Sequence, residues 1–367
     1  MREHLFAHCA FWAPSAYERA VSMLVEQTDF GMTHTGIPAH LYSIRNRNGM
    51  TAVVTDYGAV LTALLVPCRD GVTRDVVLGY DTLAEYEAGG FFGATVGRHA
   101  NRISGACFLL DGVSYRLPDN DSGCNLHSDF KIGFHKQIWD AERVDNGVRF
   151  HRVSPDGEAG FPGNLDISVF YTLDEENGLH IRYCGRADRK TLINLTNHSF
   201  FNLSGHDAGS ILSHLAAIRS EAFLEITSGR LPTGRILPVA ETPLDFRSPK
   251  PIGAEIESDW DQLRFARGYD HCFVTGARAG CLQKIAVAES PVTGCRMEVS
   301  TDLPGVQFYT ANFLPIQKGK HGTLYGPRCA FCLETEYYPD SIHFPDFPQC
   351  IFAPDEIYSA ETVYRFC

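Results

Sequence analysis

The chain has 367 residues, of which 44% are hydrophobic and 21% charged, as in a globular protein with a substantial core. The formal net charge of −12 argues against nucleic acid as a partner, because phosphate binding needs a concentrated basic surface. The sequence holds no run of roughly 18 or more apolar residues, so no membrane partner is expected.

The beginning of the chain carries no clear structural signal. Its apolar stretch faintly resembles a secretory signal, but His4 and His8 interrupt it, and we therefore expect a cytoplasmic protein. We predict residues 1–34 to be an N-terminal extension of unknown role, with a short helix from Tyr17 to Gln27. Residues 35–367 are predicted to form one domain, because no low-complexity linker divides them.

Strand patterns dominate the rest of the chain. The valine-rich segment from Met50 to Val66 is broken by Tyr57–Gly58, which indicates two strands. The alternating segments Asp166–Leu173 and Leu179–Tyr183 flank a turn-forming stretch and predict an antiparallel hairpin. A short helix is predicted from Ile211 to Ile218.

A second hairpin is predicted from Arg296–Ser300 and Val306–Thr310, which are separated by Asp302–Gly305. Strands do not alternate with long helices, and no glycine-rich phosphate loop is present, so a parallel α/β sheet is not expected. The prediction is an all-β fold, a large and mostly antiparallel β-sandwich with few short helices.

Two ionisable residues stand in apolar strand-like runs. His198 lies within Leu192–Leu203 and Glu334 within Ala330–Glu336. Since side chains alternate between the faces of a strand, each run can anchor one face in a core and present its ionisable group on the other. A histidine and a carboxylate held rigidly are suited to general acid and general base catalysis.

Four further segments concentrate polar groups near aromatic residues. These segments carry amide, guanidinium, imidazole and carboxylate groups at Asn101, Arg102, His127, Asp270 and Gln307. Such a mixture of donors and acceptors suits a polyhydroxylated ligand. Each residue also has a structural alternative: a core histidine, a solvated glutamate, an ion-paired arginine, an aspartate that caps a turn, or an exposed glutamine.

Metal binding and disulfide chemistry find little support in the sequence. Cys329 and Cys332 form the only C-x-x-C, and on a strand their side chains point to opposite faces. Buried, reduced thiols are therefore expected. Because no tight cluster of histidine, cysteine and aspartate occurs, no metal site is predicted.

The sequence resembles the aldose 1-epimerase (galactose mutarotase) family from about Met50 to Phe366. The similar stretches, in chain order, are Asp56–Ala59, Asp75–Asp81, Val96–Ile103, Gly133–Lys136, Ser154–Gly163, Leu195–Leu203, Pro232–Gly234, Leu244–Arg247, Tyr269–His271 and Leu333–Thr335. The resemblance implies a β-sandwich that binds a free hexose in an open cleft without metal or cofactor. It places the catalytic acid on His198 and the base on Glu334, and it places sugar binding on Asn101, Arg102, His127, Asp270 and Gln307.

The chain departs from the family pattern at three places. Ser128 and Asp129 follow His127 where two glycines are usual, Glu336 replaces a frequent glutamine, and Ser341–Phe344 differs from the usual Ala-Pro-Asn-Gln. On a continuing strand Glu336 shares the face of Glu334, and its charge is expected to raise the pKa of that carboxyl.

The expected function is that of an isomerase of carbohydrate metabolism, an aldose 1-epimerase that interconverts the α and β anomers of galactose or glucose. The expected partner is this small sugar, and the protein is expected to be a monomer or a homodimer. Two alternatives stay open: an epimerase of hexose phosphates, and a sugar-binding or regulatory β-sandwich without turnover.

Overall fold

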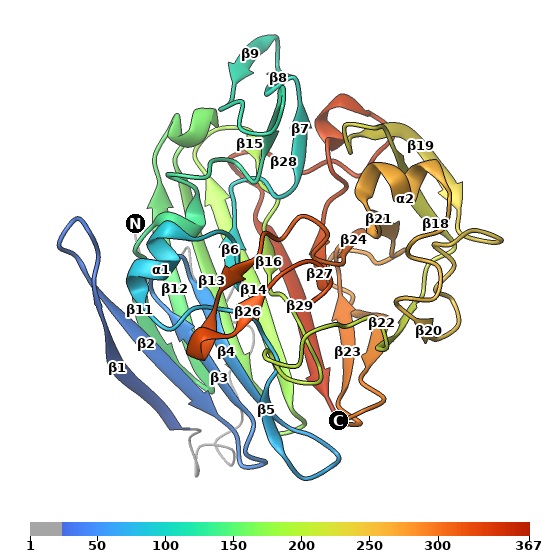
Figure 1. Cartoon of the computed structure of the whole chain (residues 1–367). Helices are drawn as coiled ribbons and strands as arrows, with labels where there is room; N and C mark the ends of the chain where they lie inside the picture. The colour runs from blue at the N-terminus through green and yellow to red at the C-terminus, as the bar shows by residue number, and fades with distance from the viewer. Residues whose placement is uncertain (1–23) are drawn as a thin grey trace.

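The computed structural model describes residues 24–367. Nine antiparallel strands form its largest sheet, and the long members of this sheet cross the centre of Figure 1. Their order in the sheet is β11 (Asp140–Val144), β12 (Gly147–Ser154), β13 (Leu165–Leu173), β14 (Gly178–Ala187), β29 (Tyr358–Phe366), β23 (Arg296–Thr301), β22 (Gln283–Glu289), β17 (Leu215–Ile218) and β20 (Lys250–Pro251).

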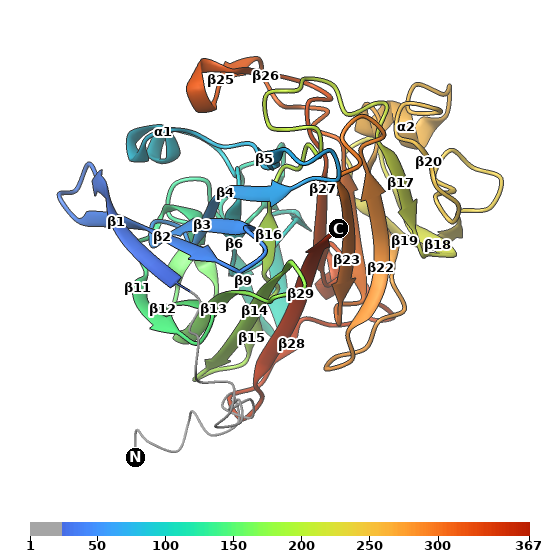
Figure 2. The same cartoon turned by 90° about the horizontal axis from the view of Figure 1, so that it is seen from below.

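Two five-stranded antiparallel sheets accompany the large sheet. The first contains β1 (Leu24–Met32), β2 (Pro38–Arg45), β3 (Thr51–Thr55), β4 (Val60–Pro67) and β5 (Thr73–Asp75), in this order. Figure 2 shows it in blue, stacked as a second layer on the green strands β11 to β14. The second runs in the order β19 (Pro232–Pro238), β18 (Ala222–Ile226), β21 (Asp270–Val274), β24 (Gly305–Tyr309) and β27 (Cys332–Glu336).

Short elements fill the space around these layers. The two-stranded pairs are β6 (Ala94–Val96) with β16 (Thr196–His198), β7 (Arg102–Ser104) with β10 (Cys124–Leu126), β8 (Cys107–Leu110) with β9 (Val113–Arg116), β15 (Thr191–Leu192) with β28 (Ile351–Phe352), and β25 (Gln317–Lys318) with β26 (Leu324–Tyr325). The α-helices are α1 (Leu83–Ala88) and α2 (Asp261–Ala266), and single 3-10 turns span Phe134–Lys136, Glu158–Gly160, Lys320–Gly322 and Ser341–His343. Among residues 24–367, neither helix has the length and apolarity needed to cross a membrane.

One face of the nine-stranded sheet forms the main core. Alternation along β13 buries Leu165, Ile167, Val169 and Tyr171 on that face. The hydroxyl of Tyr171 donates to the carbonyl of Ala59 beside the first five-stranded sheet, at 2.7 Å. On the other half of the same face, the hydroxyl of Tyr364 on β29 donates to the carbonyl of Leu333 on β27, at 2.9 Å. Both smaller sheets therefore pack on the same side, which confirms the predicted β-sandwich.

Most strand predictions are confirmed, and the predicted hairpin of Asp166–Leu173 with Leu179–Tyr183 corresponds to β13 and β14. The second predicted hairpin is wrong, because β23 belongs to the nine-stranded sheet and β24 to a five-stranded one. The connecting turn carries the chain between layers, where the hydroxyl of Thr275 donates to the carbonyl of Leu303 at 2.6 Å. Sequence spacing alone does not distinguish such a crossing from a hairpin.

Both predicted short helices are corrected where the structure describes them. Leu215–Ile218 is strand β17, because its backbone pairs with β22 and β20. Most of the segment from Tyr17 to Gln27 lies outside the described residues, but Leu24–Gln27 begins β1 and pairs with β2. In each case backbone pairing with a neighbouring strand outweighs weak helical periodicity. The predicted division at residue 34 stays a prediction.

Candidate functional site

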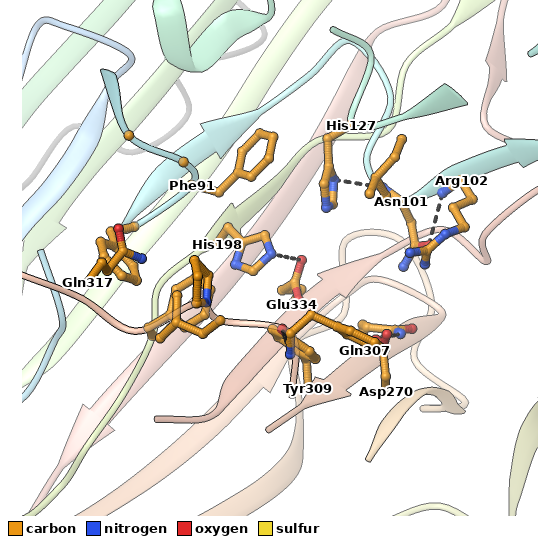
Figure 3. A pocket seen from close by; sticks show the side chains of 18 of the residues that line it. Phe91, Asn101, Arg102, His127, His198, Asp270, Gln307, Tyr309, Gln317 and Glu334 are labelled. Carbon is orange, nitrogen blue, oxygen red and sulfur yellow. Dashed lines mark hydrogen bonds and ion pairs between the residues drawn. The ribbon is translucent and has the colours of Figure 1, made fainter. Parts of the chain in front are cut away.

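A cavity of about 390 Å³ opens where β16, β21, β24 and β27 meet the loops around β7 and β10. All seven residues singled out from the sequence line it: Asn101, Arg102, His127, His198, Asp270, Gln307 and Glu334. Figure 3 shows these side chains converging from elements that are distant in the sequence. The volume lies within the range typical of small-molecule sites.

His198 and Glu334 form the centre of the cavity. His198 ends β16, and Glu334 lies in the middle of the neighbouring strand β27. Nε2 of the imidazole is 3.4 Å from Oε2 of the carboxyl, and the two residues are only 6% and 2% exposed. The preceding side chains, Asn197 and Leu333, point toward the core instead. There the amide of Asn197 donates to the hydroxyl of Tyr171, and Leu333 packs in the main core. The predicted alternation of faces is therefore confirmed.

Burial makes both members of this pair prefer their uncharged forms. Desolvation lowers the pKa of His198 to about 4. Desolvation, followed by repulsion from Glu336 and Asp270, raises the pKa of Glu334 well above its usual value, although Arg102 opposes this shift. The contact is therefore better described as one proton shared between two bases than as a permanent ion pair.

Aromatic rings fix the orientation of the His198 imidazole. It stacks on Phe200, with ring centroids 4.8 Å apart, and on Phe91, with centroids 5.8 Å apart. Its Nδ1 lies 3.6 Å from Sγ of Cys332, a weak hydrogen-bond contact. The stacked ring presents Nε2 to the cavity and to Glu334, which suits proton transfer at this one atom.

His127 is held as a hydrogen-bond donor. Its Nδ1 accepts the backbone N–H of Asn101 at 3.1 Å, so a neutral ring carries its proton on Nε2. Desolvation, with His198 and Arg102 nearby, lowers the pKa of His127 well below its usual value and keeps the ring neutral. The residue therefore offers one N–H to a ligand in the cavity.

The same tautomer bears on metal binding. His127, His198 and Glu334 place one potential ligand atom each within 4.8 Å of one another, a set that zinc accepts in other proteins. A metal bound to His127 needs a free nitrogen lone pair, but Nδ1 already accepts from Asn101 and Nε2 bears the proton. The arrangement thus fits a hydroxyl-bearing ligand better than a metal.

Asp270 and Gln307 form a second polar pair on adjacent strands. Gln307 lies directly opposite Glu334 in the register of β24 and β27. Its Nε2 donates to Oδ1 of Asp270 at 2.6 Å, whereas its buried Oε1 has no partner among the described residues. Because a buried polar atom without a partner is costly, this oxygen is a candidate acceptor for a ligand hydroxyl.

Arg102 is both ion-paired and part of the cavity wall. Its Nε donates to Oδ2 of Asp121 at 2.8 Å, and Arg230 approaches the other oxygen of Asp121 at 3.4 Å. Arg102 is therefore an ion-paired residue, as its structural alternative predicted, and it also lines the cavity. Asp121 neutralises cationic charge at this end of the cavity and fixes the direction of the Arg102 guanidinium.

Several lining residues had no usable signal in the sequence. Phe91 follows Gly89–Gly90 in a loop, and only its stacking on His198 shows its place. Gln317 reaches the cavity from a distant segment, with its Oε1 held by the hydroxyl of Tyr80 at 2.9 Å. Arg230 is one of many surface-type arginines in the sequence.

The cysteines predicted to be reduced and buried, Cys329 and Cys332, are both free and buried. The structure does not place both on one strand as predicted: Cys329 lies in a bend before β27, whereas Cys332 begins β27 and places its Sγ 3.6 Å from Nδ1 of His198. Neither forms a metal or redox pair with the other.

The sandwich carries a cavity in which a buried histidine–carboxylate pair lies among several hydrogen-bond donors and acceptors. Residues 40–365 match the family described as aldose 1-epimerase. The chain is 39% identical to galactose mutarotase from Rattus norvegicus over 351 residues, covering 93% of this chain and 98% of the rat protein. It is 35% identical to aldose 1-epimerase from Escherichia coli K12, over 90% of this chain and 96% of that protein.

Solved structures agree with these relatives. The aldose epimerase homologue from C. elegans superposes with a TM-score of 0.82 at 29% identity, covering 90% of this chain and 99% of that one. Galactose 1-epimerase from Lactobacillus acidophilus superposes with a TM-score of 0.81 at 26% identity, covering 94% and 99% of the two chains. The chain belongs to the aldose 1-epimerase family.

Proposed function

We propose that this protein is an aldose 1-epimerase, an isomerase that interconverts the α and β anomers of free aldohexoses such as galactose and glucose. The observation that carries the proposal is the 3.4 Å contact between His198 Nε2 and Glu334 Oε2 in the wall of the cavity. A binding protein without turnover does not require two proton-transferring groups at one point. The curated relatives with the names of this activity support the same function.

The reaction opens a cyclic hemiacetal and closes it again, and the pair needs one proton to catalyse it. With that proton on His198, the Glu334 carboxylate removes the proton of the anomeric hydroxyl. His198 protonates the ring oxygen as the bond from the anomeric carbon to that oxygen breaks. Ring opening leaves Glu334 protonated and His198 neutral, which is the charge distribution that burial favours. Rotation about the C1–C2 bond and reversal of both transfers give the other anomer.

The remaining cavity groups bind and orient the sugar. His127 and Arg102 supply N–H donors, Asn101 fixes the tautomer of His127, and the unpartnered oxygen of Gln307 accepts from a hydroxyl. Asp270 accepts from a second hydroxyl. Several directional contacts hold the ring at one distance from the acid–base pair, so that both transfers occur at the same anomeric centre.

Polarimetry on freshly dissolved α-D-galactose tests the catalytic roles. Glu334→Gln keeps the shape of the side chain but removes the base, and His198→Asn removes the acid. Each variant is expected to lose roughly 10²–10⁴-fold in kcat, because positioned acid or base groups contribute that much. Sugar binding measured by calorimetry is expected to persist in Glu334→Gln. A wild-type rate in either variant would remove that residue from the mechanism.

Comparison of substrates separates the alternatives. A hexose phosphate needs uncompensated positive charge, whereas Arg102 and Arg230 both face Asp121. We therefore expect turnover of galactose and glucose and much weaker turnover of glucose 6-phosphate. Residues 35–367 as one domain, a cytoplasmic location, and a monomer or homodimer without nucleic-acid partners complete the proposal; gel filtration tests the oligomeric state.

A further inference from the structure

A second glutamate lies immediately behind the pair proposed as catalytic. Glu336 follows Glu334 by two residues on β27, so both side chains leave the same face of the strand, as the sequence predicted. Glu336 is fully buried and is absent from the cavity wall. The protein therefore carries a carboxyl that cannot touch the sugar but lies about 6.6 Å along the strand from the one proposed as the base.

Its two oxygens have different surroundings. Oε1 accepts from the side-chain amide of Asn101 at 2.9 Å, whereas Oε2 has no partner among residues 24–367. Asn101 adopts a left-handed backbone conformation with φ of 61° and donates its backbone N–H to His127. Glu336 thus holds the side chain of Asn101, the residue whose backbone N–H sets the tautomer of His127.

The charged groups around Glu336 come from several elements. Asp270 on β21 and Glu334 on its own strand repel a negative charge there, and Arg102 on β7 attracts it. The thiols of Cys272 and Cys350 also interact with it. Burial is the largest influence and raises the pKa of Glu336 to about 8. Oε2 of Glu336 accepts from no donor in the described part of the chain, and a buried carboxylate without a donor is costly. The missing donor therefore also favours the uncharged form of Glu336.

We infer that Glu336 is a positioning residue that sets the alkaline limit of activity, by its charge acting on Glu334 and by its contact with Asn101. The inference rests on the proposed function. Near neutral pH the uncharged carboxyl behaves as an amide would, accepting from Asn101 and adding no charge. As the pH rises, Glu336 and Glu334 compete for their last protons, and a charge on either carboxyl strengthens proton binding by the other.

The sign of the effect follows from the proton that the catalytic pair needs. A negative Glu336 delays the loss of that proton to higher pH and spreads it over a wider pH range. If the charges keep the spacing of about 6.6 Å that two strand residues impose, at an effective dielectric constant of about 20 they interact by between one and two pKa units. The two carboxyls share this interaction as they titrate. On the alkaline side of the pH profile of activity, the midpoint of the fall (the alkaline limb) therefore moves by about one pH unit on average.

The test is the pH profile of kcat/KM for galactose mutarotation in the wild type and in Glu336→Gln. Glutamine keeps the acceptor for Asn101 and removes the charge. We expect nearly equal activity at neutral pH, coincident acid limbs, and an alkaline limb that is steeper and about one pH unit lower in the variant. The control Glu26→Gln removes an exposed carboxyl on β1 and should leave the profile unchanged.

A second variant examines the contact with Asn101. Glu336→Leu removes both the charge and the acceptor, so KM should rise further than in Glu336→Gln while the shift of the alkaline limb is similar. Superimposable profiles of the wild type and Glu336→Gln would overturn the inference, as would a uniform loss of activity without a shift. Wild-type protein that fails to catalyse mutarotation at any pH would instead overturn the proposed function.

Discussion

Asp121 offers the sharpest test of how the cavity is organised, because it lies outside the pair proposed as catalytic and still holds Arg102, a proposed sugar-binding residue. Asp121→Asn keeps the size of the side chain but removes the charge that holds Arg102 at 2.8 Å and Arg230 at 3.4 Å. A hydrogen bond to a charged group contributes about 1.5–3 kcal/mol. The side chain of Asp121 is 18% exposed, so we take the lower half of that range.

A loss of about 1.5–2 kcal/mol in the positioning of Arg102 corresponds to roughly a 10- to 30-fold rise in KM for galactose. The value of kcat should fall less, because neither His198 nor Glu334 loses a direct partner. Initial rates by polarimetry at varied sugar concentration give both constants. The matched control is Asp119→Asn, the same charge change at an exposed position of the same loop. An unchanged KM combined with a large loss of kcat would refute this account of Arg102.

Three further predictions concern stability. Arg98→Met should lower the free energy of unfolding by about 3 kcal/mol or more in urea titrations, because Ser154 and three backbone carbonyls lose buried donors. Gly93→Ala should lower the melting temperature markedly, since φ is +66° and a Cβ would lie 1.9 Å from the carbonyl oxygen of Leu61. Glu336→Gln should gain stability over the wild type as the pH rises from 4.5 to about 8: burial raises the pKa of Glu336, so the folded wild type loses stability through that window. Equal melting temperatures of the two proteins at pH 5 and pH 9 would contradict this last expectation.

The alternation of side chains explains why the catalytic candidates were readable from the sequence. Glu334 stands between Leu333 and Thr335 on a strand with a core face, so its orientation follows from a period of two residues. The same rule placed Glu336 beside it. The roles of Asn101, Asp270 and Gln307 were implied only by resemblance to a family, since an isolated amide or carboxylate has many possible surroundings.

Other features depended on contacts between distant parts of the chain. The distance between His198 and Glu334 is set by β16 lying beside β27, two strands separated by more than a hundred residues. Phe91, which lines the cavity, and Asp121, which holds Arg102, both lie in loops, and loops have no periodicity from which a side-chain direction can be predicted. The erroneous hairpin after β23 has the same origin, because a turn of a few residues can join neighbours in one sheet or cross between two.

The sequence by itself determined a β-rich sandwich and the direction of two ionisable side chains, because local periodicity decides which face of a strand is buried. The tertiary structure alone decided that these side chains meet at 3.4 Å, that burial lowers the pKa of His198 and raises that of Glu334, and that Glu336 is buried behind them with a raised pKa. Proximity and dielectric surroundings are properties of packed layers, and residues far apart in the chain create them together.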